Sequence, residues 1–181
     1  MKTRPARTCR NITSQAWSRY SLRKPKKNYV RALPHTSLLV FKMGVDKPDY
    51  DVQMHLSAKD DIQLRSNSLE AARQVANKYL ERELPNGYYF RVLTYPHNVI
   101  REKKRATGAG ADRISQGMAM SFGRAISMAA RVYKGQNVFE IKIDNQHKNI
   151  AKEAFKRAAS KLSGTFTVNV KELKAENKAV A

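Results

Sequence analysis

The sequence predicts an α+β fold in which two main helices pack on a largely antiparallel or mixed sheet. Two stretches carry apolar residues at helical spacing, and several short stretches alternate apolar with polar residues or are rich in β-formers. Their order along the chain is β-β-α-β-loop-β-β-α-β, which is typical of strands layered against helices rather than of a repeat protein. With 181 residues we expect one domain, residues 36–171, preceded by a basic arm, residues 1–35, and followed by a charged tail, residues 172–181.

The first half of the domain begins with strand patterns. Residues 36–43 form a short apolar run, residues 45–50 hold turn formers, and residues 51–57 alternate as a half-buried strand does. His55 falls on the polar register of that strand, where we expect a solvated or hydrogen-bonded side chain rather than a metal ligand.

A helix is expected after this strand. Asn67 can act as its N-cap, with Glu70 three residues later in the spacing of a capping box. Residues 85–87, Pro-Asn-Gly, end the helical pattern. An aromatic-rich strand over residues 88–95 follows and continues extended through residue 100.

The second half repeats the alternation of strand and helix. The methionine-rich run over residues 118–128 is typical of core packing, and residues 130–133 and 137–143, separated by Lys-Gly-Gln, predict a β-hairpin. Residues 147–162 predict a second helix with Gly164 just past its end. Residues 165–170 alternate as a last strand.

Charge is the dominant property of the composition. The chain has 35 Lys and Arg against 15 Asp and Glu, a net charge of +20. A chain this basic repels itself unless an anionic partner screens it; nucleic acid is the commonest such partner and an anionic membrane surface the second. No run approaches the ~18 apolar residues of a membrane span, and the N-terminus lacks the apolar core of a signal peptide, so we expect a cytoplasmic protein without a membrane partner.

Half of the excess charge lies in the basic arm, which has ten basic residues and no acidic one. Aromatic side chains stand among these cations, which suits stacking on bases beside phosphates, so we expect RNA to order the arm. The alternative is an arm wrapped over its own domain. The expected RNA-binding residues of the arm are Arg4, Arg7, Arg10, Trp17, Arg19, Tyr20, Arg23, Lys24, Lys26 and Lys27.

A second cationic segment, the basic loop, spans residues 101–113. A burst of cations precedes two glycines among small residues, so this loop cannot bury itself and its charges require water or phosphate. The residues expected to act here are Arg101, Lys103, Lys104, Arg105, Gly108, Gly110, Asp112 and Arg113.

Catalytic and metal chemistry find little support. A GxGxxG nucleotide loop would need glycine where Arg113 stands, and no GxxxxGK[ST] motif is present. Cys9 is the single cysteine, the four histidines are scattered, and His97 has no nucleophile or carboxylate near it in sequence. We therefore expect no enzyme, cofactor, metal or small-molecule substrate. An RNA-modifying enzyme and a nucleoid-type nucleic-acid packager remain the alternatives.

Several motifs occur together in one order along the chain: Arg4-Pro5-Ala6-Arg7, Ser68-Leu69-Glu70-Ala71-Ala72-Arg73, Ala76-Asn77-Lys78-Tyr79, Pro96-His97, Val99-Ile100-Arg101, Ala109-Gly110-Ala111-Asp112-Arg113, Gly117-Met118, Phe122-Gly123 and Ala130-Arg131-Val132. In these motifs the sequence resembles the archaeal and eukaryotic large-subunit ribosomal protein ten-e family, the counterpart of bacterial large-subunit ribosomal protein sixteen. It differs from the usual family pattern at Ala119, where a basic residue is usual, at Arg124-Ala125, where Lys-Pro is usual, and at Ser127, where Gly is usual.

The resemblance implies an α/β sandwich of the hammerhead type and a structural role in the large ribosomal subunit. It implies binding to large-subunit rRNA near the 5S rRNA and contact with neighbouring ribosomal proteins. It also implies that the basic loop points toward the peptidyl-transferase centre and the tRNA acceptor arms and helps to position aminoacyl-tRNA. Arg124 and Arg131 are expected as further RNA contacts.

Overall fold

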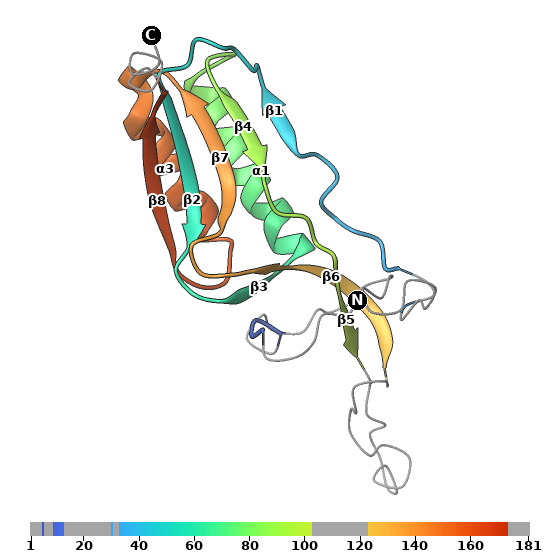
Figure 1. Cartoon of the computed structure of the whole chain (residues 1–181). Helices are drawn as coiled ribbons and strands as arrows, with labels where there is room; N and C mark the ends of the chain where they lie inside the picture. The colour runs from blue at the N-terminus through green and yellow to red at the C-terminus, as the bar shows by residue number, and fades with distance from the viewer. Residues whose placement is uncertain (1–4, 6–8, 13–29, 31–32, 103–122, 174–181) are drawn as a thin grey trace, which may run out of the picture.

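The computed structural model describes residues 5, 9–12, 30, 33–102 and 123–173, which form two antiparallel sheets and two long helices (Figure 1). The elements are β1 (Lys42–Gly44), β2 (Val52–Ala58), β3 (Ile62–Arg65), α1 (Ser66–Glu83), β4 (Tyr89–Val92), β5 (Asn98–Glu102), β6 (Arg124–Val132), β7 (Asn137–Ile143), the 3-10 turn η2 (Asn145–His147), α3 (Lys148–Ala159) and β8 (Phe166–Glu172). The large sheet has the strand order β1-β4-β7-β2-β8, and the small sheet has the order β3-β6-β5. The predicted α+β class is confirmed.

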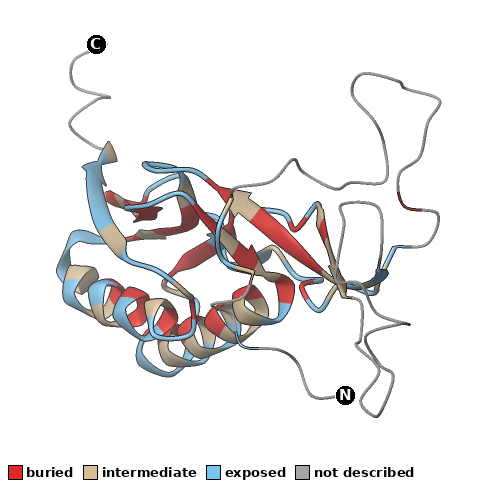
Figure 2. Ribbon diagram, turned by 90° about the horizontal axis from the view of Figure 1, so that it is seen from below, coloured by how far each residue is buried: buried red, intermediate tan, exposed pale blue. Residues whose placement is uncertain are grey.

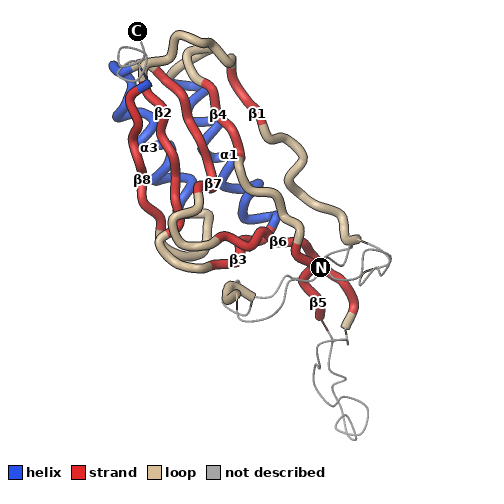
Figure 3. The backbone as a smooth tube through the Cα atoms, in the orientation of Figure 1, coloured by secondary structure: helices blue, strands red, loops and turns tan. Residues whose placement is uncertain are grey.

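Both long helices cover the same face of the large sheet (Figure 3). The buried residues of α1 recur at helical spacing: Ser66, Leu69, Ala72, Ala76 and Leu80. The buried residues of α3 are mostly alanine around Phe155, which is fully buried, and they join the side chains of α1 in one core. Figure 2 shows the buried residues gathered between the helices and the sheet. Helix amphipathicity therefore explains this layer.

Strand β2 lies near the middle of the large sheet, and its alternation separates two environments. Val52, Met54 and Leu56 face the core and are at most 1% exposed. Gln53, on the opposite face, donates a 2.6 Å hydrogen bond to the Glu140 carboxylate. His55 lies on that polar face as the register predicted and is partly exposed, but its Nδ1 is buried without a hydrogen-bond partner among the described residues.

The predicted β-hairpin is wrong. Strand β6 pairs with β3 and β5, whereas β7 pairs with β2 and β4, so the two strands belong to different sheets. The turn between them docks on the end of β2: the Gly135 N–H donates to the Ala58 carbonyl at 2.8 Å, and the Ala58 N–H donates to the Gln136 carbonyl at 3.1 Å. Gly135, with φ +81°, permits this turn. The chain thus crosses from the small sheet to the large one.

Strand β6 is also longer than predicted. It begins at Arg124, inside the run expected as core filler, and pairs with β5 from there. Met128 in that run is buried, whereas Ile126 is 40% exposed. The β5–β6 register is irregular between Ile100 and Arg101, and Ile126 has no paired residue on β5. Three positions that differ from the usual family pattern lie in this strand: Arg124, Ala125 and Ser127. The proline that is usual at position 125 could not donate a backbone hydrogen bond to a neighbouring strand.

The first elements also differ from prediction at their boundaries. Only the end of the 36–43 run forms a strand: β1 pairs with β4 from Lys42 onward, and Leu39 and Val40 before it are exposed. The short strand β3 was not predicted. It runs directly into α1, so the helix begins at Ser66, and its N-cap position is Arg65 without a side-chain capping bond rather than Asn67.

Candidate nucleic-acid interface

The small sheet is the platform of the candidate interface. One face of it, which includes Ile62, Leu64 and Val132, belongs to the main core. The register places Gln63 opposite Arg131, and Arg65 opposite Ala129, on the other face. Two arginines therefore lie on the face of the small sheet that points away from the core.

The basic arm is attached to this platform through β3. The backbone N–H of Gln63 donates to the Arg10 carbonyl and its side-chain amide donates to the Cys9 carbonyl, both at 2.7 Å. The Gln63 amide oxygen in turn accepts a hydrogen bond from Asn98 on β5. One glutamine thus ties the arm to two strands of the small sheet, and Arg10 remains exposed beside them. The remaining predicted arm residues lie outside the described residues: Arg4, Arg7, Trp17, Arg19, Tyr20, Arg23, Lys24, Lys26 and Lys27.

The basic loop begins on the same platform. Strands β5 and β6 extend away from the helices as a two-stranded stalk (Figure 1), with Arg101 opposite Ala125 and Glu102 opposite Arg124 at its end. Arg124 is exposed, and burial lowers the pKa of the partly buried Arg101 guanidinium. The other predicted loop residues lie outside the described residues: Lys103, Lys104, Arg105, Gly108, Gly110, Asp112 and Arg113.

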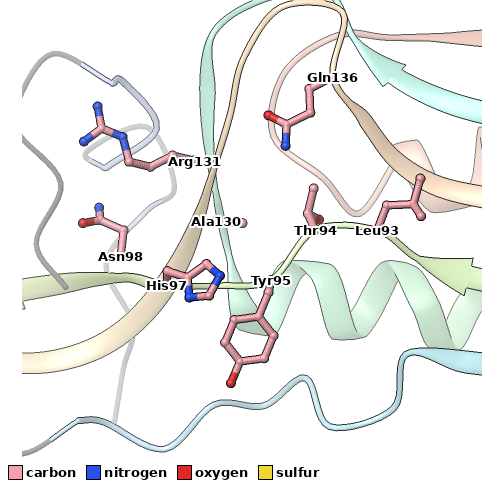
Figure 4. Close-up of a pocket in the computed structure, with 8 residues that line it drawn as sticks. All are labelled: Leu93, Thr94, Tyr95, His97, Asn98, Ala130, Arg131 and Gln136. Atoms are coloured by element: carbon pink, nitrogen blue, oxygen red, sulfur yellow. The ribbon is translucent and has the colours of Figure 1, made fainter. Parts of the chain in front are cut away.

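A cavity of about 300 Å³ adjoins the platform where β6 passes the β4–β5 connection. Its lining residues are Leu93, Thr94, Tyr95, His97, Asn98, Ala130, Arg131 and Gln136. Figure 4 shows Arg131 and Asn98 on one side of Ala130, and Thr94, Leu93 and Gln136 on the other, with Tyr95 and His97 along one edge. Of these residues, sequence reasoning singled out only Arg131 as a binding residue, because a threonine in a strand pattern carries no signal of its surroundings.

Two buried polar atoms of this cavity find no hydrogen-bond partner among the described residues, the Thr94 hydroxyl oxygen and the Arg131 Nε. Two cations elsewhere in the fold, by contrast, pair with carboxylates. Arg73 pairs with Glu70 on α1, and Lys142 of the large sheet pairs with Asp46. Arg131 therefore differs in its surroundings from Arg73 and Lys142, which support the fold.

The described ranges bring together no group of three or more His, Cys, Asp or Glu side chains suited to a metal ion. His97 packs its ring 4.7 Å from the ring of Tyr95. Neither helix in the described part of the chain is both long and apolar enough to cross a membrane.

The fold and the platform together define a basic α+β protein, and comparison with known proteins places it among the ribosomal proteins. The family model described as ribosomal protein L16p/L10e matches residues 17–169, and the chain belongs to this family. The resemblance inferred from the motifs is confirmed.

Relatives with high identity span most of the chain. The chain is 44% identical over 163 residues to the large ribosomal subunit protein uL16 of Methanococcus aeolicus, which covers 90% of both chains. It is 40% identical over 182 residues to the protein of the same name from Hyperthermus butylicus, covering 100% of both. It is also 40% identical over 175 residues to that of Natronomonas pharaonis, covering 94% of this chain and 95% of the relative.

Proposed function

We propose that this chain is an rRNA-binding constituent of the large ribosomal subunit and that the small sheet, the basic arm and the basic loop form one continuous RNA interface. The observation that carries the proposal is that arm and loop, which are about ninety residues apart in sequence, both attach to the small sheet. Membership in the ribosomal protein L16p/L10e family supports it. Arginine and lysine side chains there neutralise phosphates and release counterions, which gives affinity without base recognition.

The finer proposal concerns the direction of the basic loop. We infer that the β5–β6 stalk carries it toward the peptidyl-transferase centre and the tRNA acceptor arms, where it helps to position aminoacyl-tRNA. The domain then lies on large-subunit rRNA near the 5S rRNA, beside other ribosomal proteins of the cytoplasmic ribosome. The extension of the stalk away from the helices supports a role in reaching a distant partner (Figure 1).

A binding titration tests the RNA interface. Large-subunit rRNA transcribed from the genome that encodes this chain is compared with duplex DNA of equal length between 50 and 200 mM salt. If the interface makes about 6–10 phosphate contacts, rRNA affinity falls roughly 10³- to 10⁵-fold over this range. Equal affinity for the two nucleic acids would favour the nucleoid-type packager. Binding of nucleotides or S-adenosylmethionine in calorimetry would favour the RNA-modifying enzyme.

Two double variants with equal loss of charge locate the interface. Replacement of Arg124 and Arg131 by glutamine removes two cations of the small sheet, and we expect weaker rRNA binding and a shallower salt dependence. Replacement of Lys78 and Lys152 by glutamine removes two exposed cations from the helices and is the matched control. Equal losses in the two proteins would show that net charge, rather than this interface, determines binding.

The loop proposal has a separate test. In Lys103→Ala/Lys104→Ala/Arg105→Ala, we expect the melting temperature and incorporation into large subunits to stay unchanged, because the cations removed follow the last residue of β5 in sequence and belong to none of the elements that form the core. Binding of aminoacyl-tRNA to reconstituted ribosomes should weaken. Normal tRNA binding by subunits that contain the variant would disprove the role in tRNA positioning and leave rRNA binding intact.

A further inference from the structure

We propose that the cavity beside Arg131 binds one unstacked nucleotide of the RNA, with the base against the aromatic edge of the cavity and a phosphate at the guanidinium. The inference rests on the proposed rRNA-binding function and deepens it. Phosphate contacts position a protein on RNA, whereas a site for a base could also recognise a particular nucleotide.

The dimensions of the cavity suit a single nucleotide. Its volume of about 300 Å³ lies at the lower end of the range of about 300–1,000 Å³ for small-molecule sites. It is bounded by the β4–β5 connection, by β6 and by the turn that precedes β7. Proteins that read RNA commonly do so on single-stranded nucleotides that have left the helical stack.

Two buried polar atoms of the cavity wall have no hydrogen-bond partner among the described residues. Thr94 is 4% exposed, and neither its hydroxyl nor the Arg131 Nε has a hydrogen-bond partner among the described residues. Buried polar groups are normally paired, so these two atoms can serve as hydrogen-bonding groups for a ligand in the cavity. A hydroxyl can donate and accept, and a guanidinium only donates, so together they suit a base edge and an anion.

A third polar group is held in place at the cavity. The Gln136 side-chain oxygen accepts a 3.0 Å hydrogen bond from the Tyr133 backbone N–H, and the Gln136 backbone is bonded to Ala58 on β2. This fixes the amide so that its NH₂ group is available as a donor beside Thr94 (Figure 4). Donors for the ring nitrogens or carbonyl groups of a base therefore come from two neighbouring side chains.

The edge of the cavity offers a stacking surface. The ring of Tyr95 is stacked on Phe41 at a centroid distance of 5.5 Å and an interplanar angle of 24°, and it lies 4.7 Å from the ring of His97. Despite these contacts Tyr95 is 45% exposed. A large aromatic ring that is fixed by its neighbours and open to solvent is the usual platform for an RNA base.

The first test removes the orphan hydroxyl without changing volume or charge. In the full-length chain, Thr94→Val should weaken binding to the large-subunit rRNA transcript about 2- to 10-fold, the effect of one hydrogen bond. The salt dependence should stay unchanged because no cation is lost, and Thr94→Ser should bind like the native chain. Thr167→Val, on β8 and outside the cavity, is the control. Equal affinities of Thr94→Val and the native chain would overturn the proposal.

The second test keeps Thr94 and replaces Tyr95 by p-benzoylphenylalanine for photo-cross-linking to the same transcript. We expect cross-links to a single unpaired nucleotide; cross-links spread over paired helices would refute the site, even if Thr94→Val failed to fold. If free AMP binds the isolated protein stoichiometrically and saturating AMP leaves the rRNA affinity unchanged, the cavity is a site for a free nucleotide instead. If the native chain shows no salt-sensitive rRNA binding at all, the proposed function fails, and the nucleotide site fails with it.

Discussion

Two arginines of the structure should respond in opposite ways to the same substitution, and the contrast tests whether cations that stabilise the fold are separate from cations that bind RNA. Arg73 on α1 donates from its Nε to the Glu70 carboxylate at 2.8 Å, and its Nη1 lies 3.1 Å from the sulfur of Met43. Its side chain is 13% exposed. Arg131 on β6 has a buried Nε without a hydrogen-bond partner among the described residues. Methionine at either position keeps most of the side-chain length and removes the charge.

The expected magnitudes follow from these surroundings. Arg73→Met removes charge-assisted hydrogen bonds and leaves Glu70, 17% exposed, with the weaker Gln74 contact. Hydrogen bonds to charged groups contribute about 1.5–3 kcal/mol, and at about 2–4 °C per kcal/mol for a chain of this size the melting temperature should fall by roughly 3–12 °C. For Arg131→Met, without such a bond to lose, we expect a change within about 0.5 kcal/mol.

RNA binding should show the reverse pattern. If Arg131 contacts one phosphate, its loss lowers the slope of log affinity against log salt by about 0.7–0.9. Over a fourfold range of salt, this slope makes the salt-induced loss of affinity about threefold smaller. Arg73→Met should leave the slope unchanged.

Thermal unfolding by circular dichroism and fluorescence anisotropy with labelled rRNA measure the two quantities on the same preparations. The reasoning is refuted if Arg131→Met lowers the melting temperature as far as Arg73→Met does while its salt slope equals that of the native chain. In that case Arg131 is a structural cation, and the unpartnered Nε carries no functional meaning.

Three further predictions concern the fold. Gly44 has φ +77° and a Cβ there would overlap the Tyr88 carbonyl oxygen, so Gly44→Ala should destabilise by at least about 1–3 kcal/mol; an unchanged urea midpoint would contradict this. Phe139 is fully buried, so Phe139→Ala should cost about 3–5 kcal/mol in chemical denaturation, and a loss below 1 kcal/mol would show a loosely packed core. Hydrogen bonds from Arg73 lower the pKa of Glu70, so their stabilisation is present above the unfolded-state pKa of about 4.3 and is lost as pH falls through the lower folded-state pKa. Glu70→Gln should therefore flatten the acid limb of stability against pH, and an unaltered limb would disprove this linkage.

The sequence predicted the elements whose patterns are local and strong. The alternation of residues 51–57 gave β2 within a residue at each end, because a central strand with one face toward the helices must alternate. The apolar stripes of the two helices predicted α1 and α3, because a helix that packs on a sheet buries one side at a period of 3.6 residues, and Pro85 marked the end of α1 correctly. Boundaries failed where a neighbouring element intervened, as where β3 runs directly into α1.

Pairing between strands was beyond local reasoning. Lys134, Gly135 and Gln136 separate two strand patterns as a hairpin turn does, yet the turn is bonded to Ala58, nearly eighty residues earlier. Nothing near the turn specifies that partner. The site shows the same limit: the charge of Arg131 made it a predicted RNA contact, whereas the orphan hydroxyl of Thr94 depends on three segments that only the fold brings together.

The connection of the small sheet to the core explains how a highly cationic surface can coexist with a stable fold. Ile62, Leu64 and Val132 place one face of this sheet in the same hydrophobic core as the helices, so apolar burial holds the platform to the rest of the fold. Its opposite face and the β5–β6 stalk can then carry positive charge at little cost to packing. Cys9 and Arg10 are bonded to Gln63 of β3, and the basic loop begins with Arg101 and Glu102 of β5, so the described parts of both segments are joined to one sheet. A substitution that loosened the core under β3 should therefore weaken RNA binding by arm and loop together, although it removes no charge.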